Sequence, residues 1–234
     1  MKLGIMQPYF YPYIGYFELI YRTDRWIVFD VVQYNAKSWM NRNRILHPKE
    51  GWQYFGVPVK KSPRGTLIRD IEIEDKTNAF ERILGQLSHY KKRAKYYREV
   101  VQLIRDGFLS TSSNKLVDLN ISTLSTVCSY LGIDFQWSQC SAMNLDFTEV
   151  KHPGQWALEI CTQLGATEYL NPPAGRDIFV PEEFEERRID LRFMDLPSYK
   201  YSCHPFCFEE SLSIVDVMMW NSVDDIRSYL ARQR

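Results

Sequence analysis

The chain has 234 residues, and its 29 lysines and arginines are balanced by 29 aspartates and glutamates. A formal charge of zero gives no overall attraction to nucleic acid or to an anionic membrane, so we expect no nucleic-acid partner. No stretch approaches the roughly 18 apolar residues of a membrane span and no secretory signal pattern is present, so we predict a cytoplasmic protein.

The beginning of the chain has the pattern of a strand, a loop, a helix and a second strand. Residues 3–6 form an apolar run, residues 7–15 form a loop with two prolines and a glycine, and an apolar helical pattern follows directly. Residues 26–32 form a second apolar run that contains Asp30. This order predicts a βαβ unit with parallel strands, and ligands are expected at the carboxyl ends of such strands.

Strand and helix patterns continue to alternate along the rest of the chain. We predict strands over residues 53–59, 70–73, 135–138, 168–171 and 190–194, and helices over residues 78–108, 116–131, 155–164, 182–186, 212–220 and 223–230. The alternation predicts an α/β fold. We expect one domain over residues 1–234, with a helical insertion at about 76–131.

The first candidate site is the aromatic loop that follows the first strand. It contains Gln7, Tyr9, Tyr13, Gly15 and Tyr16. The amide and the phenols offer directional hydrogen bonds, and the ring faces can stack on a sugar or a base. The alternative interpretation is a small aromatic core that closes the end of the sheet.

The second candidate group follows the second strand and comprises Asp30, Gln33, Trp39, Asn41, Arg42 and Arg44. Arginine offers a planar fork for a carboxylate or phosphate, and asparagine can bind a neutral hydroxyl or amide. The alternative is a solvated turn with ordinary salt bridges. Lys60 follows a predicted strand and is a candidate phosphate ligand, or simply a lysine facing water.

The third candidate group is the loop after the predicted strand 168–171. Asn171, Gly175 and Arg176 lie where a ligand rim is expected, because glycine permits close backbone approach and arginine supplies charge. Ordinary turn chemistry explains the same residues equally well.

The five cysteines favour reduced thiols, because their number is odd and they are scattered. Cys203, His204 and Cys207 resemble a fragment of a metal site, but no second ligand pair has zinc-site spacing. We therefore predict no metal site in this protein. Whether Cys203, His204 and Cys207 bind a metal is left open by the sequence.

Several of these segments together resemble the WbqC-like family of bacterial proteins. The resemblance rests on residues 6–17, 30–34, 39–44, 57–61, 119–120, 154–155, 164–172 and 212–216. It implies a role in O-antigen or other surface-polysaccharide synthesis, and glycine or aminoacyl transfer to a nucleotide-linked amino sugar. The chain departs from the family at Ala174, where a second glycine is often found.

The opening segment also resembles, more faintly, the HIGH-type nucleotidyltransferases. Tyr13 and Tyr16 stand where that superfamily has its two histidines, so phenols replace imidazoles. This resemblance implies a Rossmann-like sheet of the HUP type, with ATP or a nucleotide-sugar as substrate. Phenols donate hydrogen bonds but carry no positive charge, so phosphate charge would be balanced by lysine or arginine elsewhere.

Three functions follow as hypotheses. The first is a cytoplasmic group-transfer enzyme that uses a nucleotide-linked sugar and an amino acid, with Asp30, Tyr13 or Tyr16 orienting the nucleophile. The second is a non-catalytic sugar-nucleotide binding protein. The third is a scaffold that associates with other polysaccharide-biosynthesis enzymes.

Overall fold

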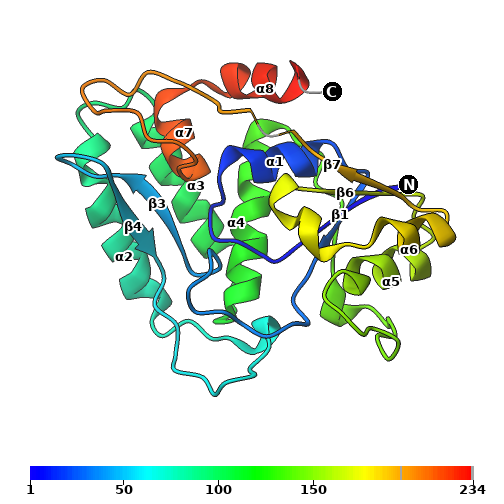
Figure 1. Ribbon diagram of the computed structural model, residues 1–234. Coiled ribbons are helices and arrows are strands. Elements are labelled where there is room, and N and C mark those ends of the chain that lie inside the picture. Colours follow the sequence, from blue (N-terminus) through cyan, green and yellow to red (C-terminus); the bar gives the residue numbers. More distant parts are fainter. Residues whose placement is uncertain (196, 233–234) are drawn as a thin grey trace.

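Five parallel strands form the central sheet of the protein (Figure 1). The structure is a computed structural model that describes residues 1–195 and 197–232, so residues 196, 233 and 234 of the predicted domain range lie outside the described part. The strands are β1 (Lys2–Met6), β2 (Arg25–Val28), β5 (Trp137–Gln139), β6 (Glu168–Asn171) and β7 (Asp190–Phe193). The predicted α/β fold with a parallel, Rossmann-like sheet is confirmed.

The strand order across the sheet is β5-β2-β1-β6-β7. The chain builds outward from β1 through β2 to β5, then returns to the other side of β1 to add β6 and β7. The direction of winding therefore reverses between β1 and β6. In open α/β sheets a crevice forms at the carboxyl ends of the strands at such a point, and ligands bind there.

Alternation along the central strands divides the core into two layers. Leu3 and Ile5 of β1 pack with Ile27 of β2 against one helical layer, whereas Trp26 and Val28 face the opposite layer. This is the expected period of two for strands buried on both faces.

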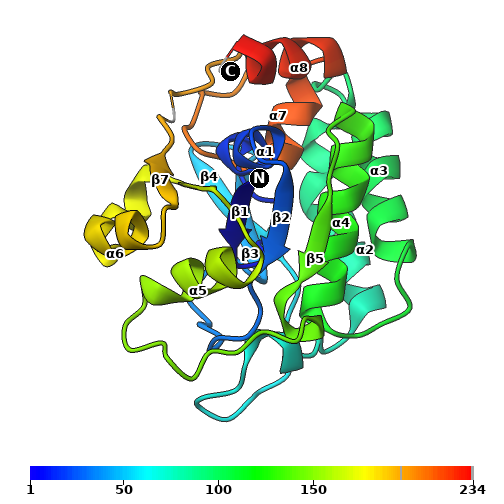
Figure 2. The same ribbon diagram turned by 90° about the vertical axis from the view of Figure 1, so that its right-hand side faces the viewer.

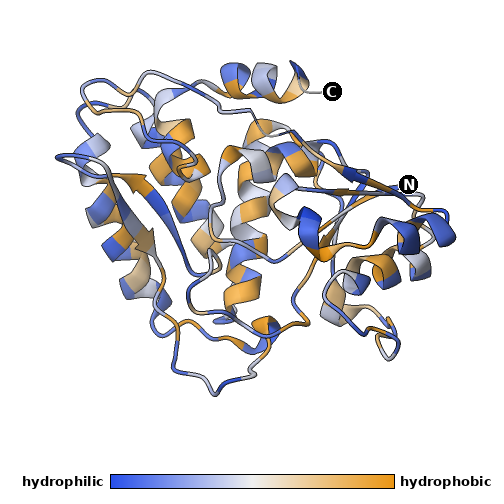
Figure 3. Cartoon of the chain, viewed as in Figure 1, coloured by the Kyte–Doolittle hydropathy of each residue, from blue (hydrophilic) through white to orange (hydrophobic). Residues whose placement is uncertain are grey.

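Helices cover both faces of the sheet (Figure 2). They are α1 (Ile14–Tyr21), α2 (Lys76–Leu87), α3 (Tyr97–Leu109), α4 (Leu116–Leu131), α5 (Gln155–Gln163), α6 (Pro181–Glu186), α7 (Ile214–Trp220) and α8 (Val223–Arg232). Residues of α5 and α6 pack in one core layer, while α1, α3, α4, α7 and α8 contribute to the other. Figure 3 shows hydrophobic residues concentrated along the central α4 and hydrophilic residues on the outlying α6.

Glycine ends α4 as the sequence pattern indicates. Gly132 follows the helix with a φ of 63°, in the left-handed region that favours glycine. The helical pattern over 78–108, in which residues 97–104 form a second amphipathic piece, corresponds to two helices, α2 and α3, separated by a short 3₁₀ turn at Ser88–Tyr90 and an irregular segment.

A two-stranded antiparallel hairpin, β3 (Arg42–Leu46) and β4 (Trp52–Gly56), lies apart from the main sheet (Figure 1). The predicted strand over residues 53–59 overlaps β4, whereas the sequence predicts no strand at β3. It is a strand because Asn43 and Ile45 are buried on one face, while the two arginines Arg42 and Arg44 lie on the other.

The predicted strand over residues 70–73 is wrong. Ile68–Asp70 form a 3₁₀ turn, and Glu72 and Ile73 make only isolated bridges to other segments. Alternating apolar residues produced the false prediction. Ile71 and Ile73 are buried in the same core, but no neighbouring strand offers a continuous set of backbone partners.

Candidate functional site

The loop between β1 and α1 is held by hydrogen bonds to its carbonyl groups. The Tyr16 hydroxyl donates to the Gln7 carbonyl (2.8 Å), and the Asn120 amide donates to the Pro8 carbonyl (2.7 Å). The backbone N–H of Ile214 donates to the Pro12 carbonyl (2.8 Å). Because prolines have no N–H, the carbonyls are the groups that need partners here. The loop is therefore a preformed element.

Two further buried side chains hold the middle of this loop. Asn43 donates from its amide to the carbonyls of Phe10 (3.1 Å) and Tyr11 (3.0 Å), and the Ser213 hydroxyl donates to the same Tyr11 carbonyl (2.7 Å). Tyr11 has a φ of 38°, a conformation that is uncommon for a residue with a side chain. The hydrogen bonds to its carbonyl maintain this conformation.

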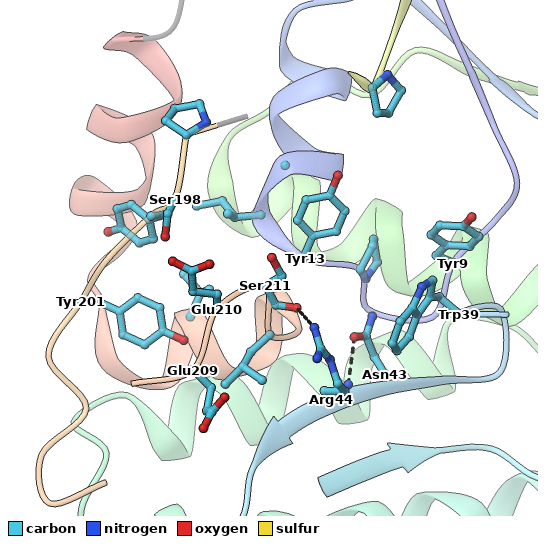
Figure 4. Close-up of a pocket in the computed structure, with 18 of the residues that line it drawn as sticks. Tyr9, Tyr13, Trp39, Asn43, Arg44, Ser198, Tyr201, Glu209, Glu210 and Ser211 are labelled. Carbon is cyan, nitrogen blue, oxygen red and sulfur yellow. Dashed lines mark hydrogen bonds between the residues drawn. The ribbon is translucent and has the colours of Figure 1, made fainter. Parts of the chain in front are cut away.

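A cavity of about 450 Å³ opens beside this loop, and we call it the first cavity (Figure 4). Its floor comprises the end of β1 and the start of α1, and Pro172 and Ala174 reach it from beyond β6. The rest comes from Trp39 and β3, from the segment before α7, and from Val217 of α7 and Tyr229 of α8. The first cavity thus lies at the reversal point between β1 and β6.

The amino terminus of α1 faces the first cavity. Ile14 and Gly15 of its first turn line the cavity, and Tyr13, the N-cap residue, makes no side-chain capping bond. The first N–H groups of a helix have no partner within the helix, and the helix dipole places partial positive charge there. This end of the cavity is suited to an anion.

Arg44 is the positively charged side chain on the wall of the first cavity. Its guanidinium donates to the Ser211 carbonyl (3.2 Å) and lies over the rings of Trp39 (5.4 Å) and Trp52 (5.0 Å). Among the described residues, no carboxylate lies within ion-pair distance of Arg44. Its charge is therefore available to a ligand.

Tyrosines supply most of the hydroxyl groups around the first cavity. Burial raises the pKa of Tyr9 and of Tyr13, and the pKa of Tyr13 is raised further by its neighbours Tyr9 and Glu18. Both phenols therefore stay protonated at neutral pH and act as hydrogen-bond donors. Neither hydroxyl has a hydrogen-bond partner within the described part of the chain.

A buried acid stands behind the wall opposite Tyr13. Asp216, fully buried, accepts hydrogen bonds from the Tyr201 hydroxyl (2.8 Å), the Leu46 N–H (3.0 Å) and the Tyr90 hydroxyl. Burial raises the pKa of Asp216, and its hydrogen-bond donors oppose that effect. Tyr201 lines the first cavity (Figure 4). The hydrogen bond to Asp216 holds its ring in place.

The segment before α7 adds carboxylates to the first cavity. Glu209 and Glu210 line it opposite the α1 amino terminus, followed by Ser211. Ser211 has a φ of 55°, and its carbonyl accepts the bond from Arg44. The first cavity therefore has a cationic wall and an anionic wall.

The structure brings several predicted site residues together at the reversal point. Tyr9, Tyr13, Gly15, Trp39 and Arg44 line the first cavity. Gln7, Asn171 and Gly175 line a neighbouring cavity that also reaches Tyr9.

Other predicted residues lie elsewhere. Tyr16 is buried in the core and uses its hydroxyl on the Gln7 carbonyl. Asp30 is fully buried, and its carboxylate accepts hydrogen bonds from the Gln139 amide (2.7 Å) and from the N–H (2.9 Å) and hydroxyl (2.6 Å) of Ser141. The contacts of Asp30 join the ends of β2 and β5. Neither Tyr16 nor Asp30 lines the first cavity.

The remaining predicted residues also lie outside the first cavity. Asn41 donates to the Val57 carbonyl (3.1 Å), and Arg42 lies over the Tyr54 ring at 4.5 Å. Gln33 and Lys60 line a separate hollow, where Lys60 pairs with Glu72 (2.8 Å). Arg176 is exposed and lies over the Phe193 ring at 4.5 Å.

Several residues that shape the site were not selected from the sequence. They are Asn43, Asn120, Tyr201, Glu209, Glu210, Ser213 and Asp216. Asparagine within an apolar helical pattern, as at Asn120, was the available signal, because a buried amide requires partners. Tyr201 and the two glutamates lie in a segment with no regular pattern, which offered no signal.

Within residues 1–195 and 197–232, no three His, Cys, Asp or Glu side chains gather closely enough to hold a metal ion. Cys203 is buried and Cys207 is exposed. None of the described helices is both long enough and apolar enough to cross a bilayer.

The fold and the first cavity define an α/β protein with a Rossmann-like sheet and a pocket where its winding reverses. The chain belongs to the WbqC-like protein family, whose sequence pattern matches residues 7–228. It is 31% identical over 219 residues to the uncharacterized protein Rv1507c of Mycobacterium tuberculosis. The matched region covers 93% of this chain and 92% of that protein. No solved structure matches the chain. Membership of this family suggests a polysaccharide-related role.

Proposed function

We propose that this protein binds a nucleotide-linked sugar in the first cavity and transfers a group to that sugar in surface-polysaccharide assembly. The observation that carries the proposal is the position of the cavity. It combines the amino terminus of α1, Arg44 and the phenols of Tyr9 and Tyr13 at the reversal point of a Rossmann-like sheet. Within residues 1–195 and 197–232, Arg44 has no carboxylate partner and the two phenols have no hydrogen-bond partner.

The phosphate groups of such a ligand suit the wall made by α1 and Arg44. Backbone N–H groups at a helix amino terminus bind phosphate oxygens, and arginine binds them with a planar pair of donors. The Arg44 guanidinium lies over the rings of Trp39 and Trp52, and this supports the role. The rings orient the planar guanidinium without neutralising its positive charge.

The sugar suits other side chains that line the first cavity. The rings of Tyr9 and Trp39 offer flat apolar faces, the Tyr13 hydroxyl donates, and Glu209 and Glu210 accept hydrogen bonds from hydroxyl or ammonium groups. An amino sugar fits this mixture better than a neutral one, because its ammonium group pairs with the carboxylates.

Aminoacyl transfer is the specific reaction that we propose. A carboxylate oxygen of the amino acid attacks the α-phosphorus of ATP, and pyrophosphate leaves. The sugar amine then attacks the carbonyl carbon, a C–N bond forms, the C–O bond to AMP breaks, and the amine loses a proton to a base. Glu209 and Glu210 line the cavity, and in this proposal one of these carboxylates receives that proton.

One observation favours a second candidate, a sugar-nucleotide binding protein without catalysis. Two of the three side chains expected to orient a nucleophile, Asp30 and Tyr16, are engaged in internal hydrogen bonds, whereas the third, Tyr13, lines the first cavity. Turnover distinguishes the two functions. Incubation with ATP, an amino acid and nucleotide-linked amino sugars gives a mass increase of the sugar only for the enzyme.

Binding is tested with UDP-, dTDP-, GDP- and CMP-linked sugars by thermal shift and calorimetry, because a ligand of the native state raises its melting temperature. We expect Arg44→Gln to weaken binding about tenfold or more, since a hydrogen bond to a charged group contributes about 1.5–3 kcal/mol. The matched control is Arg42→Gln, which changes the neighbouring arginine of β3 outside the first cavity. Equal effects of the two variants, or no binding by wild type, would overturn the proposal.

A further inference from the structure

A second cavity of about 360 Å³ adjoins the first at the carboxyl ends of β1 and β6. Four residues line both cavities: Met6, Tyr9, Pro172 and Ala174. The second cavity extends away from Arg44, between the start of α5 and the segment that follows β6. The two cavities therefore share a wall, and Tyr9 belongs to that wall.

The lining of the second cavity is aromatic and uncharged. Phe29, Trp156, Tyr169 and Phe179 all contribute to it, and none of the described residues that line it carries a charged side chain. The rings support one another, with Phe29 and Trp156 at 5.6 Å and Tyr169 and Phe179 at 5.5 Å between centroids. This contrasts with the first cavity, which has charge on two walls.

A single amide in the second cavity is free to bind a ligand. Asn171 is already engaged, because its carbonyl oxygen accepts from the Tyr169 hydroxyl (2.8 Å) and its NH₂ donates to the Pro172 carbonyl (2.9 Å). Gly175 permits this arrangement, since a Cβ there would lie 2.4 Å from the Asn171 nitrogen. The Gln7 side chain makes no hydrogen bond within the described part of the chain.

We propose that the second cavity binds the nucleobase of the nucleotide-linked sugar, with Gln7 hydrogen-bonding to the edge of the base. The inference rests on the proposed function and assigns an orientation to the ligand. The base lies among Phe29, Trp156 and Phe179, the phosphates pass the shared wall beside Tyr9, and the sugar occupies the first cavity.

The chemistry of the lining favours a base over the other parts of the ligand. Phosphates and ammonium groups are excluded because a charge placed there would lose its hydration without gaining a partner. A sugar ring needs several directed hydrogen bonds, whereas this cavity offers the Gln7 amide and the Tyr9 hydroxyl of the shared wall. A planar heterocycle gains from stacking on aromatic rings and needs few polar contacts, and an amide can both donate to and accept from its edge.

The inference predicts that the two halves of the ligand respond to different variants. The probes are UMP, CMP, AMP, GMP, dTMP and inorganic pyrophosphate, measured by calorimetry and thermal shift. We expect Gln7→Leu to weaken the best nucleoside monophosphate about threefold to tenfold, and Trp156→Leu to weaken it about tenfold or more. Neither variant changes the affinity for pyrophosphate, whereas Arg44→Gln weakens pyrophosphate binding.

Two controls accompany these variants. Trp137→Leu changes a tryptophan of β5 that is 41% exposed and lies outside both cavities, and Gln102→Leu changes an exposed glutamine of α3. Trp156 also packs on Phe147 (4.8 Å between centroids). If Trp156→Leu does not fold, Gln7→Leu still tests the inference, since it removes no existing hydrogen bond.

The outcomes separate the inference from the proposed function. If nucleotide-sugars bind wild type but Gln7→Leu and Trp156→Leu bind every nucleotide as tightly as wild type, the base lies elsewhere and only the inference fails. If pyrophosphate binds as tightly as every nucleotide, the second cavity contributes nothing and again only the inference fails. If neither nucleotide-sugars nor pyrophosphate bind wild type, both fail.

Discussion

Replacement of Asn120 by alanine tests whether the loop between β1 and α1 is held by buried hydrogen bonds. Asn120 is fully buried on α4, and its amide donates to the carbonyl of Pro8 at 2.7 Å and to that of Met40 at 2.8 Å. These two carbonyls belong to the two segments that carry Tyr9 and Trp39 into the first cavity. Asn120→Ala removes both donors at once.

The expected cost follows from the two carbonyls that lose their partner. A buried acceptor left without a donor costs about 1–3 kcal/mol, so we expect Asn120→Ala to lose about 2–6 kcal/mol of unfolding free energy. That is a large part of the roughly 5–15 kcal/mol that stabilises a typical protein. Urea unfolding followed by tryptophan fluorescence measures the loss.

Two further variants make the result decisive. Asn78→Ala removes an exposed amide from α2 and is expected to change stability by less than about 0.5 kcal/mol. Asn120→Asp keeps the side-chain size but places an acceptor against two carbonyls, so we expect it to destabilise the protein without opening a cavity. If Asn120→Ala behaves like Asn78→Ala, or if Asn120→Asp is harmless at neutral pH, the carbonyls do not depend on this amide and the reasoning is wrong.

Two other predictions concern the tyrosines and the buried acid. Tyr16→Phe removes the donor to the Gln7 carbonyl and should cost about 1–3 kcal/mol in urea unfolding, whereas Tyr13→Phe should leave stability unchanged and weaken sugar-nucleotide binding; the reverse pattern would contradict the assignment. Because burial raises the pKa of Asp216, its contribution to stability is full below about pH 4 and is lost as the pH rises through the folded-state pKa. The unfolding free energy of wild type should therefore fall relative to that of Asp216→Asn as the pH rises above about pH 4, and parallel pH profiles would refute this.

The tyrosines show how much of the site could be predicted from the sequence. The Pro-rich aromatic loop and the helix after it were apparent, but Tyr13 and Tyr16 were equivalent candidates. Tyr13 is the N-cap residue of α1 and lines the first cavity, whereas Tyr16 lies inside the first turn and points into the core. This difference depends on where the helix starts and on what packs against it.

For the charged candidates too, the tertiary structure decides which side chains line the cavity. Asp30 lies near a strand end as predicted, but Ser141 and Gln139 hold its carboxylate within the protein. Arg42 and Arg44 lie two residues apart on the same face of β3, yet only Arg44 lines the first cavity. Arg44 lines the cavity because its guanidinium contacts Ser211, a residue far from it in the sequence that belongs to another part of the cavity wall.

Local patterns in the chain determined its α/β class, its family, most of its helices and the importance of the loop after β1. Periods of two and of 3.6 residues, glycine at helix ends and proline in turns act over a few residues, so they can be recognised without a structure. The tertiary structure decided which polar side chains face a cavity and which hold the loop in place. Asn43, Asn120 and Ser213 meet that loop from distant parts of the chain, and only their packing together creates the site.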